Sequence, residues 1–138
     1  MEEITLSEDI KVFYVTANSF PEGIQEAMEK LHRIVPFSTE RNYYGISRPE
    51  GGGAIVYRAA AEEVEDGEAK RLNYATLILK KGKYISSKVY DFRKDPISIG
   101  KAFEELLKQP NLDPHGYCVE WYATDKEEVT CMIRLNQN

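Results

Sequence analysis

The sequence is poor in cysteine and histidine, with two residues of each among 138. Cys118 and Cys131 are not in a CxxC spacing, and His32 and His115 have no Cys or Asp pattern beside them. We therefore expect neither a disulfide framework nor a zinc site, and no other metal or cofactor. A single domain spanning residues 1–138 is long enough to bury a core without such cross-links.

Long apolar runs and an excess of positive charge are also missing. No run approaches the ~20 residues of a membrane span. The amino-terminal stretch, Met-Glu-Glu-Ile-Thr, lacks the basic-then-apolar pattern of a signal peptide. The formal net charge of −5 disfavours direct binding to the phosphates of nucleic acids. These absences predict a cytoplasmic protein without a membrane or nucleic-acid partner.

The chain does contain a regular alternation of strand and helix patterns. Apolar residues at i, i+3 and i+4 predict two amphipathic helices. The first follows a capping box at 19–22 and runs to about Ile34, and the second opens at Asp95-Pro96. The second helix has an apolar face of Ile99, Ala102, Phe103, Leu106 and Leu107. Strands rich in β-branched and aromatic residues are expected at 10–17, 42–48, 54–62, 74–79 and 84–92, with a tight turn at 80–83, an acidic loop at 64–70 and a final hairpin at 117–135.

Two parts of the chain match each other at a constant offset of 75 residues. Pro21 aligns with Pro96 and Ile24 with Ile99, and the strands at 42–48 and 54–61 fall on 117–123 and 129–136. We interpret this as two strand–helix–strand–strand units, at about 10–63 and about 84–136. The sequence thus predicts an α+β fold in which duplicated units form an antiparallel sheet with two main helices. Pockets commonly form where two such halves meet.

Glu120 is the one residue of the final hairpin that does not suit a core strand. It lies among apolar and aromatic residues, and a carboxylate in a half-buried strand is costly unless something pairs with it. Either Arg134 on the next strand satisfies Glu120, or the position belongs to a pocket kept for a ligand.

The alternation of side chains along the hairpin predicts which residues share a face with Glu120. We expect Tyr117, Val119 and Trp121 on the core side. Cys118, Glu120 and Tyr122 are expected on the other face, together with Met132 and Arg134. In this register Cys118 and Cys131 face opposite sides and remain free thiols. Through the repeat, Cys118, Glu120 and Met132 correspond to Tyr43, Gly45 and Tyr57.

Four short motifs between about Val12 and Leu135 together resemble a known family. They are Tyr43-Tyr-Gly-Ile-Ser-Arg48, Ile55-Val-Tyr57, Leu77-Ile-Leu-Lys-Lys-Gly-Lys-Tyr84 and Val119-Glu-Trp-Tyr122. The family is that of GyrI-like small-molecule-binding domains, which also form the effector-binding part of multidrug-responsive and AraC-type bacterial regulators. Because only a short segment precedes the first expected strand, we expect a stand-alone module without a DNA-binding segment.

The resemblance implies an acid at the bottom of an aromatic-walled pocket for lipophilic cations. Glu120 matches that acid, and Tyr57, Tyr84 and Tyr122 match the wall. Tyr43, Trp121 and Met132 complete the candidate ligand-binding set. Three alternatives stay open: a hydrolase that opens cyclopropanoid or similar electrophiles with Glu120 as its catalytic residue, a protein-inhibitor or interaction module with an unknown protein partner, and a sensor acting with a separate DNA-binding protein.

Overall fold

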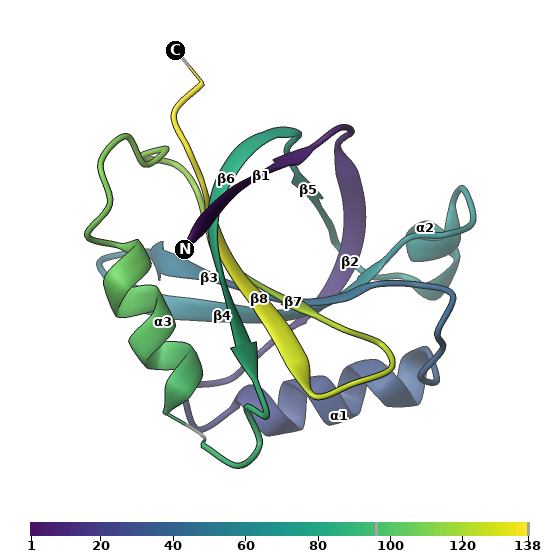
Figure 1. Cartoon of the computed structure of the whole chain (residues 1–138). Coiled ribbons are helices and arrows are strands. Elements are labelled where there is room, and N and C mark those ends of the chain that lie inside the picture. The colour runs from purple at the N-terminus through teal and green to yellow at the C-terminus, as the bar shows by residue number, and fades with distance from the viewer. Residues whose placement is uncertain (96, 138) are drawn as a thin grey trace.

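The expected strands and main helices follow one another in the predicted order, with one further strand and one further short helix among them. The computed structural model describes residues 1–95 and 97–137 (Figure 1). Its helices are α1 (Ile24–Ile34), α2 (Glu68–Leu72) and α3 (Ser98–Leu106). Its strands are β1 (Glu2–Leu6), β2 (Ile10–Thr16), β3 (Tyr43–Glu50), β4 (Ala54–Glu62), β5 (Thr76–Leu79), β6 (Gly82–Tyr90), β7 (Cys118–Tyr122) and β8 (Glu128–Arg134). They form one antiparallel sheet in the order β1-β6-β8-β7-β3-β4-β2-β5, so the predicted α+β fold class is confirmed.

The sheet order repeats the two units symmetrically about its centre. The first unit is β2–α1–β3–β4 and the second is β6–α3–β7–β8. Strands β3 and β7 pair with each other in the middle, while β5 extends the first unit and β1 extends the second. Gly45 on β3 lies directly opposite Glu120 on β7. These two positions also correspond to each other through the repeat, so the pair lies on the pseudo-twofold axis that relates the two units.

Both main helices lie on one face of the sheet, and the sheet curls away from them (Figure 1). On this helix-covered face, α1 packs its Ala27 and Leu31 in one core cluster, and α3 packs its Leu106 in another. The inner face of the curl has a third cluster, which includes Val12, Tyr44, Ile46, Tyr84, Val119 and Met132. The sheet is therefore buried on both faces.

The register of the final hairpin differs from the prediction by one residue. Glu120 lies opposite Cys131, with Cys118 opposite Ile133 and Tyr122 opposite Val129. Neither Met132 nor Arg134 therefore shares a face with Glu120. Cys118 and Cys131 share one face, although both thiols are free as expected. Alternation could not settle this register because Val129, Cys131, Met132 and Ile133 are all buried, so both faces of β8 look like core.

The constant offset of 75 also fails at the last strand. Gly45 pairs with Ala59 on β4, whereas Glu120 pairs with Cys131, three residues earlier than this offset would place the partner. The counterpart of Tyr57 is therefore Val129 and not Met132.

Both main helices differ from their predictions near their ends. Helix α1 begins at Ile24, and no side-chain hydrogen bond caps α1 or α3, so the predicted capping box is wrong. The predicted opening of the second helix at Pro96 lies outside the described residues. Leu107 follows α3 and is 57% exposed, so it is not part of the apolar face.

Three strand and loop predictions also need correction. The tight turn predicted at 80–83 does not join β5 and β6 in a hairpin, since β5 pairs with β2 and β6 pairs with β1 and β8. The short helix α2 occupies part of the predicted acidic loop, and β1 was not expected.

Residues 1–95 and 97–137 include no helix long and apolar enough to span a membrane. Within the same residues, no three His, Cys, Asp or Glu side chains gather as a metal ion would require.

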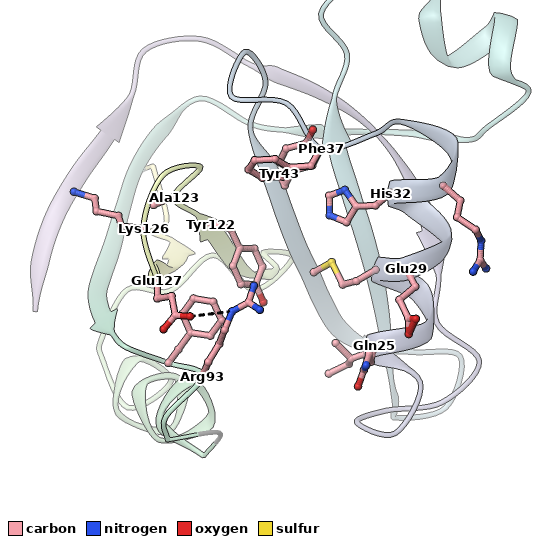
Figure 2. Close-up of a pocket in the computed structure, with 14 residues that line it drawn as sticks. Gln25, Glu29, His32, Phe37, Tyr43, Arg93, Tyr122, Ala123, Lys126 and Glu127 are labelled. Carbon is pink, nitrogen blue, oxygen red and sulfur yellow. Dashed lines mark ion pairs between the residues drawn. The ribbon is translucent and has the colours of Figure 1, made fainter.

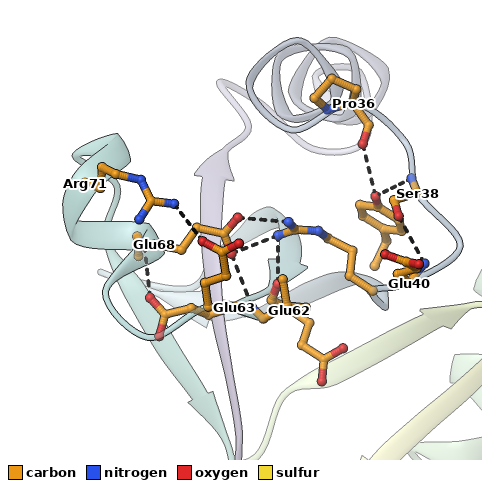
Figure 3. A network of polar contacts seen from close by, with 12 residues as sticks. Pro36, Ser38, Glu40, Glu62, Glu63, Glu68 and Arg71 are labelled. Carbon is orange, nitrogen blue, oxygen red and sulfur yellow. Dashed lines mark hydrogen bonds and ion pairs between the residues drawn. The ribbon is translucent and has the colours of Figure 1, made fainter.

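A polar network ties α2 to the start of β3 (Figure 3). Arg41 donates to both carboxylate oxygens of Glu68, at 3.1 and 2.8 Å, and to the main-chain carbonyl of Glu62 at 3.0 Å. The hydrogen bond from Arg41 lowers the pKa of the largely buried Glu68 carboxyl. Nearby, the hydroxyl of Tyr43 accepts a hydrogen bond from the amide of Ser38 at 2.8 Å. The network fixes the segment that leads into the centre of the sheet.

Candidate functional site

Glu120 is buried on the helix-covered face without a cationic partner among the described residues. Its exposed fraction is 7%, and no described Lys, Arg or His side chain forms an ion pair with it. Arg134 instead forms an ion pair with Asp113 at 3.1 Å and donates to the carbonyl of Lys81 at 2.8 and 3.1 Å. The cross-strand pair between Glu120 and Arg134, one of the two predicted outcomes, is therefore wrong.

Two tyrosines hold one oxygen of the Glu120 carboxylate. Oε1 accepts a hydrogen bond from the hydroxyl of Tyr57 at 3.2 Å and a short one from the hydroxyl of Tyr122. No side chain or amide of the described residues donates to Oε2. We call Tyr57, Glu120 and Tyr122 the tyrosine clamp. The clamp fixes the carboxylate and leaves one of its oxygens without a donor from the described part of the chain.

Burial dominates the electrostatics of the tyrosine clamp. It raises the pKa of the Glu120 carboxyl, and the two tyrosine hydroxyls only partly oppose the shift by donating to the charged form. Burial and the nearby carboxylate raise the pKa of Tyr57 and of Tyr122 well above that of a free phenol. Both tyrosines are therefore neutral hydrogen-bond donors around neutral pH.

Gly45 leaves the space that the tyrosine clamp occupies. A Cβ atom at this position would lie 2.1 Å from the hydroxyl oxygen of Tyr57 and 2.8 Å from Oε1 of Glu120. Side chains essentially never approach a Cβ so closely. The pseudo-twofold axis therefore has room for one central side chain, and the second unit supplies it.

A cleft of about 850 Å³ lies in front of the tyrosine clamp, between α1 and the end of the β7–β8 hairpin (Figure 2). Glu29 and His32 of α1 line one wall. The opposite wall has Tyr122 and an ion pair between Arg93 and Glu127, whose charged atoms are 3.7 Å apart. Glu120 and Tyr57 do not line the cleft, so Tyr122 connects the cleft to the buried carboxylate.

Aromatic rings line much of this cleft. Phe37, which is 58% exposed, stacks on Tyr43 with ring centroids 5.5 Å apart. His32 lies 5.0 Å from the same tyrosine ring, and Phe92 meets Tyr122 edge-on at 5.6 Å. Nothing in the sequence indicated that Phe37, His32 and Phe92 belong to a site, because Phe37 and His32 lie outside the strands and the strand expected at 84–92 ends at Tyr90. Their positions depend on how the helix and loops return to the sheet.

The structure brings only part of the predicted residue set together. Tyr43, Tyr57 and Tyr122 lie with Glu120 on the helix-covered face. Tyr84, Trp121 and Met132 belong to the cluster on the inner face of the curl. The hydroxyl of Tyr84 donates to the carbonyl of Lys80 at 2.6 Å. These three side chains are therefore separated from the tyrosine clamp by the sheet itself.

Three solved structures share this fold across nearly the whole chain. An integron cassette protein from the mobile metagenome of Vibrio cholerae has a TM-score of 0.69 at 14% identity, covering 98% of this chain and 95% of that one. The protein SAV2435 bound to tetraphenylphosphonium has a TM-score of 0.69 at 15% identity, covering 99% and 93%. A Staphylococcus aureus protein provisionally assigned to bacterial transcription regulation has a TM-score of 0.61 at 14% identity, covering 96% and 97%.

No protein-family model and no curated protein matches the chain. Identities of 14 and 15% establish a common fold and nothing further. The shared fold is consistent with the resemblance to GyrI-like domains.

Proposed function

We propose that this chain, which has the fold of the GyrI-like domains, binds a lipophilic organic cation in the cleft beside α1. The observation that carries the proposal is the Glu120 carboxylate. It is buried, no described residue neutralises it, and it lies directly behind a ring that lines a large aromatic cleft. A buried charge without a partner is costly. A cationic ligand would remove that cost, and this gain is the driving force for its binding.

The cleft supplies two further sources of affinity for such a ligand. The stacked pair Phe37 and Tyr43 offers aromatic faces, which attract cations and bury apolar groups. The cleft volume of about 850 Å³ lies within the range of roughly 300–1,000 Å³ usual for small-molecule sites. The structural neighbour SAV2435 was solved with tetraphenylphosphonium, a lipophilic cation of this class.

Calorimetric titration with tetraphenylphosphonium tests the proposal. We expect a dissociation constant in the micromolar range, corresponding to about −8 kcal/mol. Triphenylphosphine oxide is a matched control because it keeps three of the aryl rings and has no net charge. Binding of the neutral compound should be at least about tenfold weaker, a difference of roughly 1.4 kcal/mol. Equal affinities would exclude a role for charge and overturn the proposal.

A second candidate function is hydrolysis of a cyclopropanoid or similarly strained electrophile. The raised pKa of Glu120 favours it, because a general acid must hold its proton at the working pH. Tyr122 lies between Glu120 and the cleft and is the available relay for that proton. Incubating the protein with a strained electrophile and following ring opening tests this function, and product formation that disappears in Glu120→Gln would establish an enzyme.

A further inference from the structure

A second concavity lies on the other side of the hairpin end. This groove, of about 460 Å³, runs between β1 and the end of the β7–β8 hairpin, and its walls include Ile4, Asn42, Lys88, Trp121, Asp125 and Glu128. The groove and the first cleft share only Tyr122 and Ala123. The end of the hairpin therefore acts as a wall with a separate concavity on each side.

Trp121 is held in a fixed orientation in this groove. Its indole N–H donates to Oδ1 of Asn42 at 3.1 Å, and the amide group of Asn42 donates in turn to Glu62 at 3.1 Å. The ring of Tyr44 packs beside the indole, with centroids 6.3 Å apart. Because the indole N–H is already satisfied, the half-buried ring can offer only its apolar face and edge to a ligand. An indole face is the best aromatic partner for a cation.

The charges around the groove also favour a cation. Its walls include three carboxylates, those of Glu2, Asp125 and Glu128, against the single ammonium of Lys88. Glu128 is largely buried and pairs with Lys126 at 3.3 Å and Lys88 at 3.8 Å. Glu2 and Asp125 form no ion pair with any described residue.

The walls of the first cleft carry more cationic than anionic side chains, so the charge proposed to attract a cation there is the buried Glu120 behind Tyr122. Its lining includes Arg33, Arg93 and Lys126 against Glu29 and Glu127. The two concavities therefore differ in charge as well as in size.

We propose that the groove over Trp121 is a second small-molecule site, for a compact aromatic cation. The indole contributes the cation–π face, and the carboxylates of Asp125 and Glu2 contribute the attraction, because Glu128 is already paired with two lysines. A volume of about 460 Å³, against about 850 Å³ for the first cleft, favours a single-ring ligand over a tetra-aryl one. This site does not involve the tyrosine clamp, so binding in the groove can be tested independently of the function proposed for the first cleft.

Trp121 gives the site its own reporter because it is the only tryptophan of the chain. A ¹H–¹⁵N spectrum of the full chain therefore contains one indole N–H resonance, which can be followed during titration with phenyltrimethylammonium. We expect a saturable shift of this resonance in the wild type and an unchanged dissociation constant in Glu120→Gln, which removes the charge behind the first cleft. N,N-dimethylaniline, a neutral compound of similar shape, should shift the resonance much less at equal concentration.

Two neighbouring acids of the same turn provide matched variants. Asp125 lines the groove and Glu127 lines the first cleft, and both are exposed, so neither substitution should affect folding. Asp125→Asn should weaken binding of phenyltrimethylammonium by about threefold to fivefold, as expected for an exposed charge. Glu127→Gln should leave it unchanged. The proposal is overturned if the indole resonance does not move at millimolar ligand, if Glu120→Gln abolishes the shift, or if the two turn variants behave alike.

Discussion

At the scale of single residues, Glu120 and Gly45 differ because the space between β3 and β7 has room for only one side chain. They occupy equivalent positions of the two units and face each other across β3 and β7. Only one side chain fits there, because the Tyr57 hydroxyl fills the space beside Gly45. The sequence revealed the acid and the matching glycine, because both lie in strands that align in the repeat. The resemblance placed Tyr57 and Tyr122 in the wall around the acid, but no pattern in the sequence indicated that both hydroxyls donate to the same carboxylate oxygen.

Substitution of Glu120 by Gln tests whether the acid contributes to function at the expense of stability. The folded-state pKa of this acid is raised above its unfolded value, so its contribution to stability is most favourable below the unfolded pKa of about 4.3 and is lost as the pH rises through the folded pKa. Glu120→Gln should be more stable than the wild type at pH 8, by about 1 kcal/mol, and this gain should shrink toward pH 4.5.

Urea unfolding at pH 4.5 and pH 8 measures both free energies. Glu29→Gln, which removes an exposed carboxylate of α1 beside the cleft, is the control for the loss of one surface charge. A loss of several kcal/mol in Glu120→Gln would instead show that the carboxylate is part of a structural network.

Substitution of Gly45 by Ala tests the close packing around the tyrosine clamp. The added methyl group would overlap the hydroxyl of Tyr57, so we expect the free energy of unfolding to fall by about 1–3 kcal/mol. Gly100→Ala is the matched control, because Gly100 lies in α3 with open space around its Cβ position. This control should gain up to about 1 kcal/mol from the higher helix propensity of alanine. Thermal unfolding of the two variants should thus move in opposite directions, and equal shifts would contradict the packing described for Gly45.

At the scale of elements, the hairpin β7–β8 and helix α1 together form the cleft. The existence of both was predictable from their hydrophobic periods, and α1 ends at the predicted residue. The pairing of β8 was not predictable, because a one-residue slip changes the face of every side chain and both faces of this strand are buried. For the same reason the sequence assigned Met132 to the face of Glu120, whereas the strand places Cys131 there.

Removal of the Arg41 side chain tests how firmly α2 is anchored to the sheet. Arg41 and Glu68 form a bidentate pair with side-chain exposures of 13% and 8%. Arg41→Ala leaves the Glu68 carboxylate without its partner, so we expect a loss of about 2 kcal/mol in stability and faster amide exchange in α2. The effect should diminish in acid as Glu68 becomes protonated, because its folded-state pKa is lowered.

Arg71 provides the comparison for Arg41. Arg71 pairs with Glu65 at 3.4 Å on the surface of the same helix, and both side chains are largely exposed. Arg71→Ala should therefore change stability by less than about 0.5 kcal/mol. Hydrogen exchange that is equally fast in the two variants would show that the Arg41 network does not hold α2.

At the scale of the whole molecule, the duplicated architecture creates both the central acid and the concavities around it. The repeat predicted the symmetric sheet and the helices on it, because these follow from local periodicity and from one offset shared by several elements. It could not predict β1, a half-exposed edge strand, or the aromatic residues that come from loops, such as Phe37 and Phe92. These features depend on how the sheet curls, and no local pattern in the sequence encodes that curl.

The central claim is that the charge of Glu120 attracts the ligand, and the pH dependence of tetraphenylphosphonium affinity in wild type and Glu120→Gln tests it most directly. An acid whose pKa is raised must lose its charge as the pH falls from 8 toward 4.5, so wild-type affinity should fall with it. Other titratable groups beside the cleft, such as His32, Glu29 and Glu127, are present in both proteins and cancel in the comparison. We predict weaker binding in Glu120→Gln at pH 8 and a difference that shrinks as the pH falls. Identical affinities and slopes in the two proteins would contradict the account.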